Sequence, residues 1–295
     1  MTKEDKTAVS LVLGSGGARG LAHIGVIHWL EENGFEIRSI SGSSMGALIG
    51  GVYAVGKLHE FEQWVLAITK RDIFTLLDLS FHKSGFIKGD RIIDTIKNIV
   101  GDALIEALPV TFTAVATNLE TGKEVWIKKG PLFDAIRASI SIPLLFTPFK
   151  YKGMHLVDGG VLNPVPIAPT FSDLSDITIA VNVSGVVSES KVPQVSPPKR
   201  AKPSSRLQGK ISGFIEEMKG LATSYLSTDA GMIDIANQSF DAMQSTIARQ
   251  KLAAYPPDIS IEIPRNVSTI LEFNRAGELI ILGHAAAARA MKLEG

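Results

Sequence analysis

The sequence predicts an α/β fold in which helices pack on a parallel sheet, and three observations indicate it. Short apolar runs typical of buried strands alternate with segments whose apolar residues recur at helical spacing. The order strand, turn, helix, strand, turn, helix opens the chain, as a parallel sheet with packed helices requires. A strand pattern near the C-terminus, at 258–264, indicates that the chain returns to the sheet.

The expected elements follow one another along the chain. A strand at 8–13 ends in a glycine-rich turn, and the helix after it, 21–34, stops at Gly34, a residue type favoured at helix C-termini. A strand at 35–41 and a helix at 45–57 repeat the unit. The further elements expected are helices at 59–72 and 90–102, strands at 110–118 and 123–129 joined as a hairpin, strands at 154–158 and 176–184, and a closing helix at 278–293.

The composition changes from Gly185 onward, where residues 185–210 become rich in Pro, Ser and Lys and lose all periodicity. This composition predicts a flexible basic loop. We therefore expect a single domain over 1–295, with a motif-bearing core at about 8–184, the basic loop at about 185–210 and a C-terminal helical part at about 211–295.

Charge and composition exclude several classes of function. The 295 residues include 30 basic and 30 acidic side chains, so no global field attracts nucleic acid. The absence of cysteine excludes disulfides, thiolate metal sites and a cysteine nucleophile. The N-terminal apolar run is too short for a secretory signal, and no window reaches the roughly 20 apolar residues of a membrane span. We therefore expect a cytoplasmic protein, with peripheral membrane contact still open.

The sequence GSSMG at 42–46 matches G-x-S-x-G at an expected strand-to-helix turn. In a nucleophile elbow the serine, here Ser44, has a strained backbone, so Gly42 and Gly46 must lack bulky side chains. The helix that follows would direct its N-terminal dipole at the serine and favour developing negative charge. A structural glycine turn explains the same pattern, and this motif alone does not decide between the two.

A glycine-rich stretch, GSGGARG at 14–20, lies between the first expected strand and helix. As a dinucleotide fingerprint it is defective, because Arg19 stands where the third glycine belongs and the chain has no P-loop lysine motif. As an oxyanion hole it is suitable, because consecutive glycines let backbone N–H groups converge on an oxygen. Arg19 would then brace the loop or add positive potential near the reacting centre.

The third motif is DGG at 158–160, at the end of an expected strand. A carboxylate at the carboxyl edge of a strand lies where parallel α/β sheets place their ligands. Asp-Gly is also a common turn pair, and taken alone the motif favours that structural explanation.

Together the three motifs resemble those of the patatin-like phospholipase family. GGARG at 16–20, GSSMG at 42–46 and DGG at 158–160 stand in the family's order, and the resemblance covers roughly residues 8–184. It implies a three-layer α/β/α sandwich with a mostly parallel central sheet, related to the α/β hydrolases. It also implies hydrolysis of lipid acyl esters (phospholipid, lysophospholipid or acylglycerol) by a serine–aspartate dyad that needs no metal or other cofactor.

The resemblance gives each motif residue a role. Ser44 would be the nucleophile and Asp158 the base. The oxyanion-hole loop would comprise Gly16, Gly17 and Arg19, and the supporting glycines would be Gly14, Gly20, Gly42, Gly46, Gly159 and Gly160. An ordinary aspartate titrates near about 3.9, so burial must raise this pKa if Asp158 is to act as a base at neutral pH.

No histidine has a persuasive place in the site. A catalytic triad of the α/β-hydrolase order needs a histidine after the acid, and only His284 follows Asp158, within an expected helix. His23 and His28 fall on the first expected helix. His155 lies at an odd offset from Asp158, so its side chain should point to the other face of the strand.

Two segments are candidates for bringing a lipid to the site. Residues 72–90 carry many large apolar side chains and fit either a cap over the site or an ordinary core-facing helix and loop. The basic segment 191–210 favours transient contact with an anionic membrane surface or, alternatively, a solvated disordered loop. The charges proposed for that contact are Lys199, Arg200, Lys202 and Arg206.

Three rival functions remain at the level of sequence. An acyltransferase would use the same dyad and differ only in its acceptor, which is an alcohol in place of water. A non-catalytic lipid-binding regulatory protein would have no need for all three motifs. A nucleotide-binding protein would use GSGGARG as a phosphate cradle, and the missing third glycine and lysine weigh against it.

Overall fold

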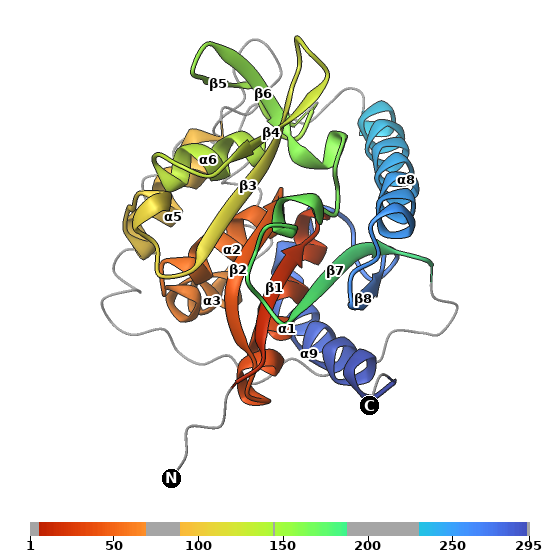
Figure 1. The fold of residues 1–295 in the computed structure, drawn as a ribbon. Helices are drawn as coiled ribbons and strands as arrows, with labels where there is room; N and C mark the ends of the chain where they lie inside the picture. Colours follow the sequence, from red (N-terminus) through yellow and green to blue (C-terminus); the bar gives the residue numbers. More distant parts are fainter. Residues whose placement is uncertain (1–5, 69–88, 144, 188–229, 294–295) are drawn as a thin grey trace.

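The computed structural model describes residues 6–68, 89–143, 145–187 and 230–293 (Figure 1). The expected cap therefore lies outside the described residues except for Gly89 and Asp90, and the basic segment 191–210 lies wholly outside them. Both of these expectations stay predictions.

A central sheet runs through the molecule in the strand order β5-β6-β3-β2-β1-β7-β8, with β4 paired to β3. The strands β3, β2, β1, β7 and β8 are mutually parallel, whereas β4, β5 and β6 are antiparallel to their neighbours. The strands are β1 (Ala8–Leu13), β2 (Glu36–Ser43), β3 (Thr111–Asn118), β4 (Lys123–Ile127), β5 (Phe149–Tyr151), β6 (Met154–Asp158), β7 (Ile177–Gly185) and β8 (Ile259–Pro264).

Helices connect the parallel strands and cover the sheet. The α-helices are α1 (Ala22–Glu32), α2 (Met45–Ala54), α3 (Leu58–Ala67), α5 (Asp90–Val100), α6 (Leu132–Ser139), α8 (Ala230–Ala254) and α9 (Ala276–Leu293). Short 3-10 turns are η1 (Gly17–Leu21), η2 (Ile105–Ala107), η3 (Gly159–Val161), η4 (Ala168–Thr170) and η5 (Phe273–Arg275).

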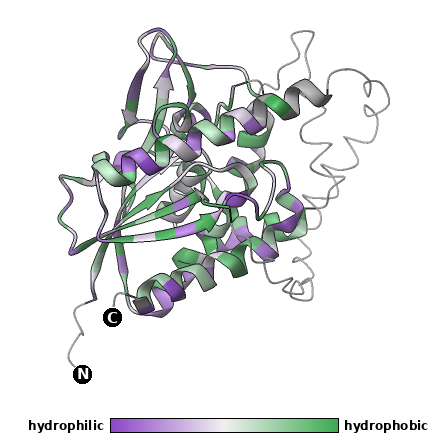
Figure 2. Cartoon of the chain, turned by 90° about the vertical axis from the view of Figure 1, so that its right-hand side faces the viewer, coloured by the Kyte–Doolittle hydropathy of each residue, from purple (hydrophilic) through white to green (hydrophobic). Residues whose placement is uncertain are grey.

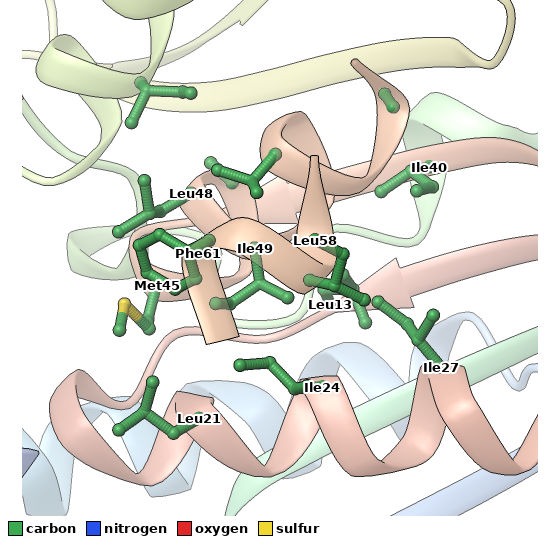
Figure 3. Packing of buried hydrophobic residues seen from close by; sticks show 14 of the residues in the cluster. Leu13, Leu21, Ile24, Ile27, Ile40, Met45, Leu48, Ile49, Leu58 and Phe61 are labelled. Carbon is green, nitrogen blue, oxygen red and sulfur yellow. The ribbon is translucent and has the colours of Figure 1, made fainter. Parts of the chain in front are cut away.

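The alternation of side chains along β1 divides the core into two clusters, one on each face of the sheet. Leu11 and Leu13 belong to a large cluster that includes the buried faces of α1, α2 and α9 (Figure 3). Val12 points to the other face, where it packs with Ala180 of β7 and Ala248 of α8. Figure 2 shows the strands between the two long helices α8 and α9, so the expected three-layer arrangement with a mostly parallel sheet is confirmed.

Most of the expected elements are present, and two of the observed elements have no counterpart among the expected ones. The strand, turn and helix units at the start of the chain, the β3–β4 hairpin and the returning strand β8 all form as expected. Strand β5 and helix α6 are not anticipated, because runs of 3 and 8 residues are too short to give a clear periodic signal. In the described parts of the chain, no helix has the length and apolar character needed to cross a membrane.

Candidate active site

The register of the sheet brings the ends of β2 and β6 together. Ser43, the last residue of β2, pairs with Val115 of β3. The next residue of β3, Ala116, pairs with Asp158 at the end of β6. Ser44 follows Ser43 directly, so strand pairing places the candidate nucleophile and the candidate base at the same level on the two sides of β3, although they are far apart in the sequence.

Ser44 occupies a backbone conformation that is rare for a residue with a side chain. Its φ of 55° and ψ of −121° lie at the junction between β2 and α2. The strained turn is held by Ser139 at the end of α6, whose Oγ accepts the Ser44 N–H at 2.9 Å and donates to the Val115 carbonyl at 2.6 Å. Strain that the surroundings hold in place is characteristic of functional turns.

The two glycines that flank Ser44 are required by close packing. A Cβ atom on Gly46 would lie 2.0 Å from the carbonyl oxygen of Leu13, and one on Gly42 would lie 2.5 Å from the backbone nitrogen of Ala47. Any side chain at either position would clash with backbone atoms, so the tight turn requires glycine on both sides of Ser44. Ser44 is the N-cap of α2, so the positive end of the helix dipole faces it.

Asp158 is fully buried at the end of β6 and is held in a fixed orientation. Its Oδ1 accepts the N–H of Gly160 at 2.7 Å, and its own N–H donates to the carbonyl of Ser141 at 2.9 Å. Among the described residues, Oδ2 has no hydrogen bond of regular geometry.

Burial dominates the acidity of this carboxyl group. It raises the pKa of Asp158 to about 7, against smaller opposing effects of the Ser44 hydroxyl and the Gly160 N–H, which stabilise the charged form. Ser44 is therefore close enough to stabilise the charged form of the Asp158 carboxylate. Because Oδ2 accepts no hydrogen bond of regular geometry from the described residues, the Ser44 hydroxyl and the carboxylate are only loosely aligned with each other. Catalytic hydrogen bonds are often long in unliganded sites and tighten when substrate binds.

The glycine-rich loop lies at the same edge of the sheet, because Leu13 at the end of β1 pairs with Gly42 of β2. Neighbouring strands and loops fix the loop through the N–H groups of Gly14, Ser15 and Ala18, which donate to the carbonyls of Val181, Pro164 and Ile270 respectively. Within the described chain, the N–H groups of Gly16 and Gly17 have no protein acceptor. Of the two residues, Gly17 also lines the cavity that adjoins Ser44.

Arg19 braces the loop, which is one of the two roles expected for it. Its guanidinium is completely buried and donates to the carbonyl of Gly16, to the carbonyl of Arg265 and to both carboxylate oxygens of Asp241. Because an acidic partner neutralises this charge, Arg19 adds little free positive potential at the reacting centre. The supporting glycines of all three motifs, Gly14, Gly20, Gly42, Gly46, Gly159 and Gly160, are buried in the same region.

An apolar cavity of ≈ 110 Å³ adjoins Ser44. Its walls come from α2, α3, α5, the segment after α6 and the segment around η5. Figure 3 labels the lining residues Met45, Leu48 and Phe61, whose side chains lie close together. Apart from Gly17 and Ser44, every described residue that lines it has an apolar side chain. A cavity of this kind suits a hydrocarbon chain.

No histidine of the described chain forms a hydrogen bond with Ser44 or Asp158. His23 is buried and neutral, since burial lowers its pKa to about 4, and its Nε2 is 2.8 Å from the carbonyl oxygen of Gly14. His155 and His284 are exposed and pair with Glu120 and Glu32. The expectation that His155 points away from Asp158 is confirmed.

The sequence motifs do not reveal Ser139 and Ser141, two buried residues that hold the site. Ser139 supports the turn at Ser44, and the backbone of Ser141 supports Asp158. Both belong to or follow the unanticipated helix α6. Isolated serines carry no pattern that distinguishes them from surface residues, so no sequence signal marks them.

The fold, the elbow turn and the glycine-rich loop together define an α/β protein of the patatin type, and comparison with known proteins agrees. The family model described as patatin-like phospholipase matches residues 11–171. This chain belongs to the patatin-like phospholipase family, a class of lipid hydrolases.

Similar proteins include two with curated names. An uncharacterized NTE family protein of Mycobacterium tuberculosis is 39% identical over 328 aligned residues, covering 96% of this chain and 91% of the relative. Lysophospholipase nte1 of Emericella nidulans is 32% identical over 187 residues, which cover 61% of this chain but only 12% of that larger protein.

The fold is also found in a solved structure. The crystal structure of VipD from Legionella pneumophila superimposes with a TM-score of 0.54 over 99% of this chain and 68% of that chain. At 16% sequence identity, this likeness concerns the fold alone.

Proposed function

We propose that the protein is a serine acyl hydrolase that cleaves carboxylic ester bonds of lipids through a dyad of Ser44 and Asp158. The observation that carries the proposal is the buried carboxyl group of Asp158, whose pKa is raised to about 7 beside Ser44 at an apolar cavity. A carboxylate with this pKa is a far better base at neutral pH than an ordinary aspartate.

In the first half-reaction, the Asp158 carboxylate takes the proton of the Ser44 hydroxyl while Oγ attacks the ester carbonyl carbon. The carbonyl π electrons move to oxygen and form a tetrahedral oxyanion. Its collapse breaks the bond to the leaving oxygen, which receives the proton from Asp158, and an acyl-enzyme remains on Ser44.

The oxyanion is stabilised by backbone amides. The N–H groups of Gly16 and Gly17 have no acceptor within the described chain, and the N-terminus of α2 adds the positive end of its dipole. Removing one donor from such a site typically lowers kcat by about 100- to 1000-fold.

In the second half-reaction, water attacks the acyl-enzyme. Asp158 accepts a proton from that water and then returns it to Ser44 Oγ as the fatty acid departs. An alcohol in place of water would give acyl transfer, so analysis of the product distinguishes the two outcomes.

The apolar walls of the cavity favour an acyl chain as the group beside the nucleophile. Phospholipids, lysophospholipids and acylglycerols all supply such a chain, and the name of the fungal relative, a lysophospholipase, is consistent with this set. We further propose transient contact with anionic membranes through Lys199, Arg200, Lys202 and Arg206, which lie outside the described residues. Deletion of 191–210 should weaken co-sedimentation with anionic vesicles; unchanged binding would remove this part of the proposal.

The proposed activity is tested by fatty-acid release from phospholipid and lysophospholipid micelles and from short p-nitrophenyl esters. Wild type should hydrolyse at least one class, whereas Ser44→Ala and Asp158→Asn should lose turnover. His284→Ala, at an exposed residue, should keep most of the activity. If it behaves like Ser44→Ala, a triad replaces the dyad. If Ser44→Ala hydrolyses lipid as wild type does, the proposal is wrong.

A further inference from the structure

Helix α8 contacts the glycine-rich loop through a buried ion pair. Arg19 Nη1 donates to Asp241 Oδ2 at 2.8 Å, and Nη2 donates to Oδ1 at 2.5 Å, which gives a two-point contact. The Arg19 side chain is 0% exposed and that of Asp241 is 23% exposed. A buried guanidinium needs such a partner, because an unpaired charge in the interior is strongly unfavourable.

The same guanidinium fixes the peptide that carries a proposed oxyanion donor. Arg19 Nε donates to the carbonyl oxygen of Gly16 at 3.2 Å. That carbonyl and the N–H of Gly17 belong to one planar trans peptide, so they point in opposite directions. A bond that holds the Gly16 carbonyl therefore also fixes the direction of the Gly17 N–H, and Gly17 lines the cavity together with Ser44.

A second residue of α8 reaches the loop at Ser15. Gln244 Nε2 donates to Ser15 Oγ at 3.0 Å, and both side chains are buried. A Cβ atom on Gly160 would lie 2.2 Å from Gln244 Nε2, so the amide also packs against the turn that holds Asp158. Helix α8 thus contacts both the proposed oxyanion loop and the proposed base turn.

We propose that Asp241 is a positioning residue for the reaction: through Arg19 it sets the direction of the Gly17 N–H, and Gln244 supports the same loop. This inference rests on the proposed hydrolase activity. Asp241 does not touch the reacting atoms, so its effect should appear in the transition state more than in substrate binding.

The test measures kcat and KM per active site, with active sites counted by the endpoint of fluorophosphonate labelling. Asp241→Asn keeps the shape of the side chain but cannot accept both guanidinium donors. It should lower kcat about 10- to 100-fold and leave KM within about 3-fold of wild type. Asp241→Glu, which restores the carboxylate, should recover part of the lost kcat.

Further variants separate positioning from general stability. Gln244→Leu should lower kcat in the same sense, whereas Gln238→Ala, an exposed amide on the same helix, should not change it. The double variant that carries Arg19→Gln and Asp241→Asn should have a kcat no lower than that of the less active single variant, because the two side chains act as a unit.

The melting temperature of each variant is recorded beside its kinetics. If Asp241→Asn melts earlier but has a normal kcat per labelled site, Asp241 only stabilises the fold and the inference is overturned. A loss of kcat in Gln238→Ala as large as that in Asp241→Asn would overturn it as well, because the effect would then be general to α8. Failure of the hydrolase proposal itself would give a different result, because Ser44→Ala would then hydrolyse lipid at the wild-type rate.

Discussion

Asp158 combines two properties that oppose each other: it is fully buried, and its proposed role requires the charged form. Burial favours the protonated acid, which is why the pKa lies at about 7. The nearby Ser44 hydroxyl and the N–H of Gly160 partly offset this, because both stabilise the charged carboxylate. The result is a group that changes charge near neutral pH and is therefore suited to exchange protons there.

The pH dependence of turnover follows from this pKa. Asp158 must be deprotonated to accept the Ser44 proton, so kcat/KM should fall about tenfold per unit below pH 7 and level off above it. A stopped assay with a p-nitrophenyl ester, read after adjusting each sample to one pH, measures the profile. The variant that carries both His155→Ala and His284→Ala should have a pH profile of kcat/KM with the same midpoint as wild type. A midpoint close to the ordinary aspartate value would contradict the assignment.

The raised pKa also has a cost for stability. Between the ordinary value of 3.8 and about 7, the folded state holds a proton that the unfolded state has released. The free energy of unfolding therefore falls as pH rises through that window, by at most about 1.4 kcal/mol per unit.

Asp158→Asn removes this ionisation and its amide oxygen can still accept the Gly160 N–H. Its melting temperature should exceed that of wild type at pH 8, and the difference should shrink toward pH 4. Scanning calorimetry across that range measures it, with the exposed aspartate variant Asp134→Asn as control. A difference that is the same at pH 4 and pH 8 would show that burial does not raise this pKa.

At the scale of elements, several helices and loops contribute the wall of the cavity, and the segment after α6 is one of them. Leu145 is partly buried there and lines the cavity, so a larger side chain should shorten the space for an acyl chain. Leu145→Trp should reduce hydrolysis of long-chain esters at least about tenfold relative to short ones, since displaced methylenes are each worth about 0.8 kcal/mol.

A chain-length series of p-nitrophenyl esters measures this effect. Leu104→Trp, at an exposed leucine that does not line the cavity, is the matched control and should leave the chain-length profile unchanged. If Leu145→Trp has the wild-type profile, the acyl chain lies elsewhere.

Sequence patterns predict the elements that carry the motifs better than the contacts that support them. Apolar periodicity and glycine spacing are local, so β1, β2, α2 and the elbow turn are recoverable from them. The link from Arg19 to Asp241 joins residues 222 positions apart, and the pKa of Asp158 depends on its complete burial. Neither property has a local signal, because both arise only when distant segments pack together.

At the scale of the whole molecule, the mostly parallel sheet brings three distant motifs to one edge, with the aspartate arriving on β6, which runs antiparallel to β3. The elbow follows β2, the glycine-rich loop follows β1 and the aspartate ends β6, and β3 joins β2 and β6 (Figure 1). The patatin-like fold thus explains why the motifs are separated in sequence and adjacent in space.

Peptide mapping after fluorophosphonate labelling tests the central claim most directly. The full chain is labelled, digested and analysed by mass spectrometry, beside Ser44→Ala and Asp158→Asn. The account predicts a phosphonyl adduct on Ser44 in wild type, none at that peptide in Ser44→Ala, and labelling slowed at least about 100-fold in Asp158→Asn. An adduct on another residue, or equal labelling of Asp158→Asn and wild type, would contradict it.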